Sequence, residues 1–254
     1  MLQRTTRRLS VTEIGHSYFE QAQRILEDLD NLQSTLFDHH QEPKGHLKIT
    51  APTTFGELYM APLMAAYLQA YPQMNVQLNL SDRFVNVVEE GFDLAIRIGQ
   101  LKDSSLIAKG LTHTRVGIYA SRQYLKTHGY PHTPEDLRQH ACILDTNVST
   151  PDKWRFENPH NGTLQTVKIA GRFQVNSAAA IKAMILAHQG IGLCPEYVIG
   201  HQRSPEIEQV LSDYPMQSLG LYVLYPHQKY LSIKTRTLID FLEKKLKGTP
   251  PWQH

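Results

Sequence analysis

Three short segments of the sequence hold the residues best suited to bind a small ligand. Each places hydroxyl, amide or guanidinium side chains where a predicted strand ends: Thr53-Thr54-Phe55, Arg97-Ile98-Gly99 and Asn176-Ser177. At a helix start the backbone N–H groups lack intrahelical partners, and the helix dipole favours a negative charge there. Ligands of open α/β sheets bind beyond the carboxyl ends of the strands. The three segments therefore predict a site for a small carboxylate.

A purely structural role accounts for the same residues. Thr53, Thr54 and Ser177 are good helix N-caps, and their spacing alone favours that interpretation. Arg97 either points into a cleft or forms an ion pair on its own strand. The residue pattern leaves both interpretations open.

The sequence lacks the motifs of well-known catalytic and metal sites. It holds no GxSxG, no HExxH, no P-loop and no GxGxxG after a strand. Gly190-Ile191-Gly192 is predicted to follow a helix and start a strand, the reverse of the order in a nucleotide-binding turn. Cys142 and Cys194 have no zinc-like spacing. We therefore expect no enzymatic activity, no bound metal and no cofactor.

Composition sets the broad class of the protein. With 254 residues, of which 41% are hydrophobic, the chain is long enough for two domains. A net charge of +2 is too small to bind nucleic acid by bulk electrostatics, so any DNA contact depends on local clusters. No apolar run approaches the roughly 20 residues that cross a bilayer, and no secretory signal is recognisable. We expect a cytoplasmic protein with reduced, buried thiols and no membrane contact.

From His46 onward, strand and helix patterns alternate, which predicts an α/β fold with mainly parallel sheets. Strands are predicted at residues 47–51, 76–80, 92–99, 115–121, 142–144, 191–194 and 219–225, with a hairpin of 154–156 and 166–169. Helices are predicted at residues 52–70, 84–90, 122–128, 178–188 and 233–246.

A long amphipathic helix is predicted before this region, from residue 13 to about residue 37, with Thr12 as its N-cap. Apolar residues recur every three or four positions, as in a coiled-coil seam: Ile14, Tyr18, Ala22, Ile25, Leu29, Leu32 and Leu36. A helix packed on its own domain is the alternative. About 25 residues, at 1.5 Å each, is long for that role, so we expect a dimerisation helix followed by a polar hinge.

Two stretches resemble LysR-type transcriptional regulators. The segment Leu2 to Gly15 is similar to the part of that family that closes the winged helix-turn-helix and starts the linker helix. The residues 83–85, 88–99 and 103–108 are similar to its effector-binding domain, and the resemblance extends from Leu2 to about Leu246. It implies that Arg4, Arg7 and Arg8 lie beside the DNA backbone.

The resemblance also implies a domain organisation. We expect a wing remnant (1–12), a linker helix and hinge (13–45), effector subdomain I (46–117 and 220–246), effector subdomain II (118–219) and a loose tail (247–254). The implied fold is a two-subdomain, periplasmic-binding-protein-like (type 2) effector domain, joined by two crossing strands near residues 117–119 and 220–222. If a ligand binds between the subdomains, as the resemblance implies, Thr53 and Thr54 are expected to contact it. For Ser177, a role in ligand binding and a role as a helix N-cap both stay open.

The implied function is an effector-sensing regulator that forms a homodimer or homotetramer and controls transcription in response to a small, anionic molecule. The helices that read the major groove in this family precede the wing. We therefore expect either a misplaced start codon or a shortened form, with DNA binding weak or absent here and present in the full-length form. A stand-alone solute-binding protein of the same fold is the alternative, and an enzyme on this fold is the third hypothesis.

Overall fold

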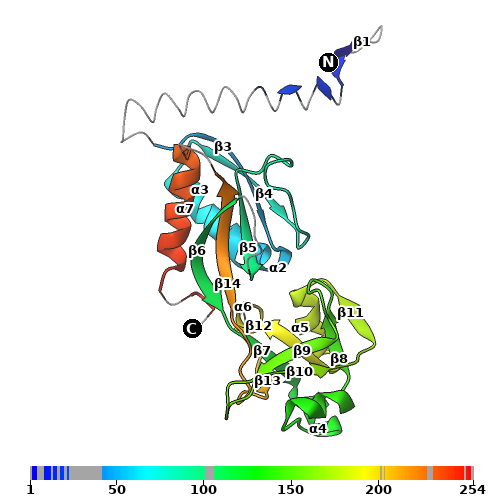
Figure 1. The fold of residues 1–254 in the computed structure, drawn as a ribbon. Coiled ribbons are helices and arrows are strands. Elements are labelled where there is room, and N and C mark those ends of the chain that lie inside the picture. The colour runs from blue at the N-terminus through cyan, green and yellow to red at the C-terminus, as the bar shows by residue number, and fades with distance from the viewer. Residues whose placement is uncertain are drawn as a thin grey trace.

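Two five-stranded sheets organise the chain in the computed structural model, and each is flanked by helices (Figure 1). The structure describes residues 2–4, 9–12, 14–15, 18–19, 22, 42–100, 106–200, 202, 204–227, 231–248 and 250–252. Within these ranges, every helix is too short or too polar to cross a lipid bilayer.

The first sheet has the strand order β4-β3-β5-β14-β6. Its strands are β3 (Gly45–Ala51), β4 (Met74–Leu80), β5 (Leu94–Gly99), β6 (Leu106–Thr114) and β14 (Leu219–Pro226). A helix follows β3 and consists of α2 (Thr53–Phe55), the π-helical η1 (Gly56–Met60) and α3 (Ala61–Ala70). Pro62 near the start of α3 cannot donate a backbone hydrogen bond, which is consistent with an irregular ladder just before it. Helix α7 (Ile233–Leu246) packs beside α3, where the rings of Tyr67 and Phe241 lie 5.3 Å apart.

The second sheet has the order β11-β8-β12-β7-β13. Its strands are β7 (Val116–Ser121), β8 (Cys142–Asp145), β11 (Phe173–Val175), β12 (Ile191–Pro195) and β13 (Ile207–Val210). Around it lie α4 (Arg122–His128), the 3-10 helix η2 (Pro134–Gln139), α5 (Ala178–Leu186), α6 (Glu196–Gly200) and the hairpin of β9 (Lys153–Glu157) and β10 (Leu164–Lys168).

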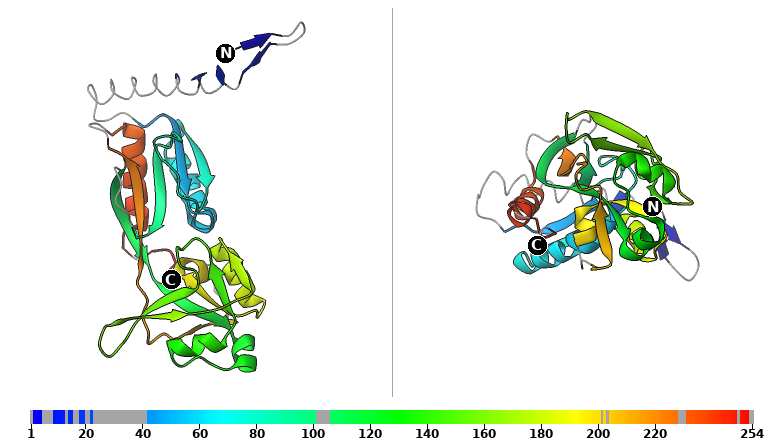
Figure 2. Two further views of the ribbon diagram at one scale, coloured as in Figure 1. Left: turned by 45° about the vertical axis from the view of Figure 1, so that its right-hand side comes forward. Right: turned by 90° about the horizontal axis from the view of Figure 1, so that it is seen from below.

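The chain passes from the first sheet to the second between β6 and β7, and returns between β13 and β14. We call the part built on the first sheet lobe I and the part built on the second sheet lobe II. They are stacked one above the other in Figure 1 and in the left view of Figure 2. The two-unit α/β fold predicted from the sequence is confirmed. The sheets are mixed rather than mainly parallel, because β7 and β14 each enter their sheet from the other lobe and run antiparallel to their neighbours.

The prediction of secondary structure was wrong for residues 84–90 and missed strands β6, β11 and β13. Residues 84–90 form an extended segment and turns instead of a helix. Val85 and Val87 are both buried, a spacing of two that suits an extended chain, and the Glu90 side chain accepts a hydrogen bond from the N–H of Asn86. Strand β6 was missed, because Ala108-Lys109-Gly110 at its centre lowers the strand propensity.

The N-terminal region is described in part. Strand β1 (Leu2–Arg4) pairs antiparallel with β2 (Leu9–Val11). The Thr12 hydroxyl accepts a hydrogen bond from the N–H of Gly15 at 3.1 Å, as an N-cap does. Ile14, Tyr18 and Ala22 are helical. Four other seam residues and two wing residues of the prediction lie outside the described ranges: Ile25, Leu29, Leu32, Leu36, Arg7 and Arg8.

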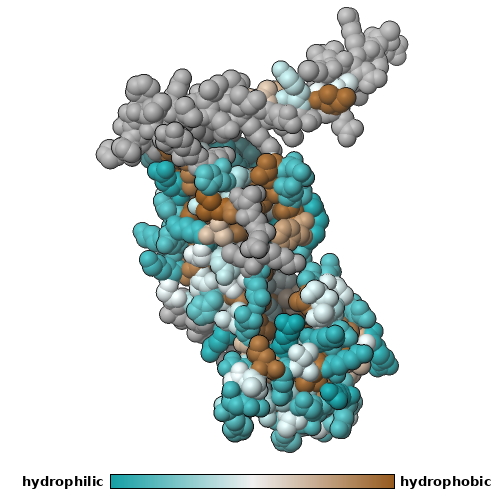
Figure 3. Space-filling model, in the orientation of Figure 1, coloured by the Kyte–Doolittle hydropathy of each residue, from teal (hydrophilic) through white to brown (hydrophobic). Residues whose placement is uncertain are grey.

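The apolar residues gather in cores on each lobe. In lobe I the strands β3 and β5 bury Leu47, Ile49 and Ile96 against Leu238 and Leu242 of α7. In lobe II a separate core includes Ile118, Trp154 and Phe156. The face visible in Figure 3 is mainly hydrophilic, with apolar residues in small separate patches.

The C-terminal segment is not loose at Trp252, contrary to the sequence prediction. This side chain is 3% exposed and contacts the rings of Phe55, Tyr59 and Tyr197. A Cβ atom on Gly200 would lie 2.6 Å from the Trp252 carbonyl oxygen, so a glycine is needed for this approach. The segment therefore packs where α6 of lobe II meets the helix that follows β3.

We predict that Trp252→Ala lowers the free energy of unfolding by about 3 kcal/mol, because it removes a large buried ring. Urea denaturation followed by circular dichroism measures the change. Phe84→Ala is the matched control, since the Phe84 side chain is 77% exposed, and should have little effect. Equal, small effects of the two substitutions would contradict the packing described for Trp252.

Candidate ligand-binding cleft

A cleft of about 730 Å³ lies between the lobes, a size that suits a small organic molecule. Its floor and walls come from segments far apart in the sequence. Lobe I contributes the ends of β3, β4 and β5 together with β6 and β14, and lobe II contributes residues 145–149 and the regions of α5 and α6. Polar lining residues include Thr54, Asp82, Arg83 and Arg97 from lobe I, and Asp145, Asn147 and Ser149 from lobe II.

The structure brings some of the predicted site residues to this cleft and not others. Its lining includes Thr54, Arg97, Ile98 and Gly99. Gly99 has a φ of 138°, a backbone conformation that favours glycine. Phe55 is fully buried in the core of lobe I.

Thr53, Asn176 and Ser177 lie beside the lining residues Thr54 and Ala178 in the chain, but are not part of the lining. The carbonyl of Asn176 accepts a hydrogen bond from the side chain of Asn147, which does line the cleft, at 2.8 Å.

Three of the N–H groups at the two helix starts are already used within the protein. The N–H of Thr53 donates to Asp82 Oδ1 at 3.2 Å, and that of Ala180 donates to Ser177 Oγ at 3.3 Å. The N–H of Ala179 donates to Thr54 Oγ1 at 3.3 Å, so the Thr54 hydroxyl joins lobe I to the start of α5 in lobe II. The donors that the sequence offered to a carboxylate are thus partly satisfied without one.

Arg97 retains a hydrogen-bond donor. It lies on β5, opposite Tyr222 of β14, and its Nη1 donates to the carbonyl of Ile96 at 2.9 Å. Its Nη2 is buried and has no hydrogen-bond partner among the residues that the structure describes. Burial lowers the pKa of Arg97, and the negative charge of Asp82 acts in the opposite direction. The guanidinium stays charged at neutral pH and can receive an anion.

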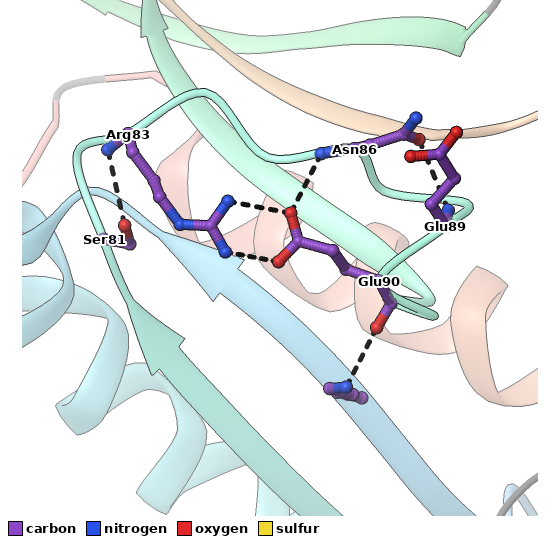
Figure 4. Close-up of polar contacts among 6 residues, drawn as sticks. Ser81, Arg83, Asn86, Glu89 and Glu90 are labelled. Atoms are coloured by element: carbon purple, nitrogen blue, oxygen red, sulfur yellow. Dashed lines mark hydrogen bonds and ion pairs between the residues drawn. The ribbon is translucent and has the colours of Figure 1, made fainter. Parts of the chain in front are cut away.

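The second arginine of the cleft is already paired. Arg83 forms a two-point ion pair with Glu90, in which Nη1 donates to Oε1 at 2.8 Å and Nη2 donates to Oε2 (Figure 4). The Glu90 carboxylate also accepts from the N–H of Asn86, and the Glu90 carbonyl accepts from Lys48 Nζ. These bonds fix the loop that carries Phe84 along the cleft wall.

Two carboxylates in the cleft were missed from the sequence. Asp82 comes two residues after the end of β4, and Asp145 is the last residue of β8. Asp145 Oδ1 accepts the N–H of Asn147 at 2.9 Å. Burial raises the pKa of Asp145, and the charge of Asp82 raises it further. The rule that ligands bind at the carboxyl ends of strands would have identified both positions.

Two α/β lobes joined by two crossings, with a polar cleft between them, define the ligand-binding unit of a periplasmic-binding-protein-like fold. The family model described as the LysR substrate binding domain matches residues 40–247. The chain therefore belongs to the family of LysR-type transcriptional regulators. The relatives named below are transcriptional regulators and not enzymes, in agreement with the prediction from the sequence.

An uncharacterized HTH-type transcriptional regulator of Haemophilus influenzae is 35% identical over 92% of this chain and 81% of its own length. The probable regulator LtrA of Klebsiella pneumoniae is 32% identical over 96% of this chain and 80% of its own length. The solved structure of CrgA, a LysR-type transcriptional regulator from Neisseria meningitidis, matches with a TM-score of 0.73 at 28% identity, and the match covers 97% of this chain and 84% of that one.

We predict that Asp145→Asn raises the melting temperature of the ligand-free protein at neutral pH. The folded protein raises the pKa of this carboxyl above its ordinary value of 3.8, so the charged form opposes folding at neutral pH. The charged Asp145 becomes protonated as the pH falls through its pKa in the folded protein toward the ordinary value, so its cost to stability disappears. The difference in melting temperature between Asp145→Asn and the native protein should therefore shrink as the pH falls. Melting curves between pH 7.5 and pH 4.5 measure this; a variant less stable than the native protein at pH 7.5 would contradict the assignment.

Proposed function

We propose that this chain is the effector-sensing, oligomerising part of a LysR-type regulator, and that its effector is a small organic anion bound between the two lobes. The observation that carries the proposal is Arg97, which lines the cleft and whose buried Nη2 has no hydrogen-bond partner within the described part of the chain. A charged donor without a partner is costly in a low-dielectric site, and an anionic ligand supplies that partner. The protein acts in the cytoplasm, where a regulator meets the chromosome.

The effector controls transcription by changing the relative position of the lobes. A ligand shifts an equilibrium between two arrangements only if it contacts them differently. The cleft is lined from both lobes, and the hydrogen bond between Thr54 and Ala179 crosses between them. An anion held by Arg97 lies beside this bond, with Ile98 and Gly99 at its edge, while Thr53, Phe55, Asn176 and Ser177 support the segments that carry the lining.

The N-terminal region joins two copies of the chain and, in the full-length form, adds contacts to the DNA backbone. Ile14 is 76% exposed and Tyr18 is 57% exposed, so these seam residues present an apolar face to a partner helix. The antiparallel pair β1–β2 supports a wing, on which Arg4, Arg7 and Arg8 contact phosphates. The lobes of neighbouring copies also pair with one another. Together with the pairing of the N-terminal helices, this contact produces a homodimer or a homotetramer.

We predict that a thermal-shift screen of small carboxylic acids finds ligands that stabilise the protein, and that Arg97→Gln weakens their binding about ten- to a hundredfold. A charge-assisted hydrogen bond contributes roughly 1.5–3 kcal/mol, which corresponds to that range. Isothermal titration calorimetry measures both dissociation constants. Arg172→Gln removes an exposed positive charge outside the cleft lining and should bind the acids as the native protein does.

Two results would count against the anionic effector. One is a screen in which only cations or neutral apolar compounds stabilise the protein. The other is a set of acids that binds Arg97→Gln and the native protein with equal affinity, since the site would then lie elsewhere.

We predict that the double substitution Ile14→Glu and Tyr18→Glu lowers the oligomeric state, because it places charges in the apolar seam. Light scattering coupled to size-exclusion chromatography measures the mass at micromolar concentration. Glu20→Gln with Arg24→Gln changes the polar face of the same predicted helix and should leave the mass unchanged. A monomeric native chain would show that this seam does not dimerise the protein.

A further inference from the structure

The charged groups of the cleft do not match a simple anion. Among the lining residues that the structure describes, Arg83 is neutralised by Glu90, which leaves Arg97 as a cation with a spare donor and leaves Asp82 and Asp145 as carboxylates. The hydrogen bonds of the two carboxylates to backbone N–H groups use Oδ1 in each case. Because a carboxylate offers about four acceptor positions, both retain capacity for a ligand.

The two carboxylates belong to different lobes. Asp82 follows β4 in lobe I, and Asp145 ends β8 in lobe II, yet both line the same cleft. Arg97 also belongs to lobe I. An anion held by Arg97 alone would contact the charged groups of one lobe only, and would add a third negative charge to the cleft.

We infer that the effector carries, beside its acid group, a hydrogen-bond donor that binds between Asp82 and Asp145, as the hydroxyl of a hydroxy acid or the ammonium of an amino acid would. The inference rests on the proposed function, because it takes the acid group to lie on Arg97. The donor reduces the repulsion between the carboxylates and gives the ligand a charged contact in lobe II. A molecule with both groups therefore links the lobes, which an acid alone does not.

The body of this ligand is apolar. Phe84 of lobe I and Val148 of lobe II both line the cleft, and their side chains are 77% and 49% exposed. Ile98 and Leu219 line it as well. A hydrocarbon group between these side chains removes apolar surface of both lobes from water.

Two matched series of compounds test the inference. The first is 3-phenylpropanoate, phenyllactate, phenylalanine and phenethylamine; the second is 4-methylpentanoate, 2-hydroxy-4-methylpentanoate, leucine and 3-methylbutylamine. Calorimetry on the full chain compares members with the same skeleton, and the carboxylic acids found by the thermal-shift screen are compared with their hydroxy and amino analogues in the same way.

We expect the hydroxy acid or the amino acid to bind at least tenfold more tightly than the plain acid of the same skeleton. Which of the two binds more tightly identifies the donor. In Asp145→Asn this preference should fall below threefold while the affinity for the plain acid does not weaken. Asp213→Asn, which removes an exposed carboxylate outside the cleft lining, should keep the full preference. Melting curves confirm that both variants are folded.

The failures are distinguishable. Plain acids that bind as tightly as their analogues, and lose affinity in Arg97→Gln, would overturn the inference and leave the anionic effector in place. A preference that persists unchanged in Asp145→Asn would also overturn it. Two other results would overturn the proposed function as well. One is that the amines bind best and that Arg97→Gln does not change their affinity. The other is that neither the two series nor the screen contains an acid that binds.

Discussion

An aromatic contact between the lobes determines where this protein has room for a ligand. Phe55 and Tyr59 of lobe I meet Tyr197 of α6, and Trp252 from the C-terminal segment contacts all three rings. The Tyr59 hydroxyl also donates to the buried carbonyl of Tyr197 at 2.9 Å. Because α6 shares the core of lobe I at this point, the lobes are held together on one side and leave a cleft beside Tyr197.

The chemistry of the cleft depends on which polar groups the protein satisfies internally. Asp82, Thr54 and Ser177 accept hydrogen bonds from N–H groups at the two helix starts, and Glu90 pairs with Arg83. Of the charged lining groups that the structure describes, the guanidinium of Arg97 and the acceptor positions of Asp82 and Asp145 remain for a ligand. The contact between Thr54 and Ala179 crosses the same space, so a ligand there competes with, or reinforces, a bond between the lobes.

Local sequence patterns were sufficient where local forces dominate. Helices α4 and α7 have the bounds that the sequence predicts, and the structure shows that Ser121 and Ser232 cap their starts. The rule on strand ends found Thr54 and Arg97. Asp82 and Asp145 also stand at strand ends, but they belong to different lobes and share a cleft only because of how the lobes are stacked. Trp252 was misjudged for the same reason, since a short terminal segment carries no periodic pattern that reports its burial.

The central claim is that an acidic effector binds between the lobes on Arg97. A crystal structure of the protein with the carboxylic acid that binds most tightly tests it directly. The account predicts a carboxylate within hydrogen-bond distance of Arg97 Nη2, with the ligand in contact with residues of both lobes. A structure in which the cleft is empty and the acid is bound elsewhere would contradict the account. The surface pocket of lobe II, lined by Arg122, Lys126 and His188, is an example of such a place.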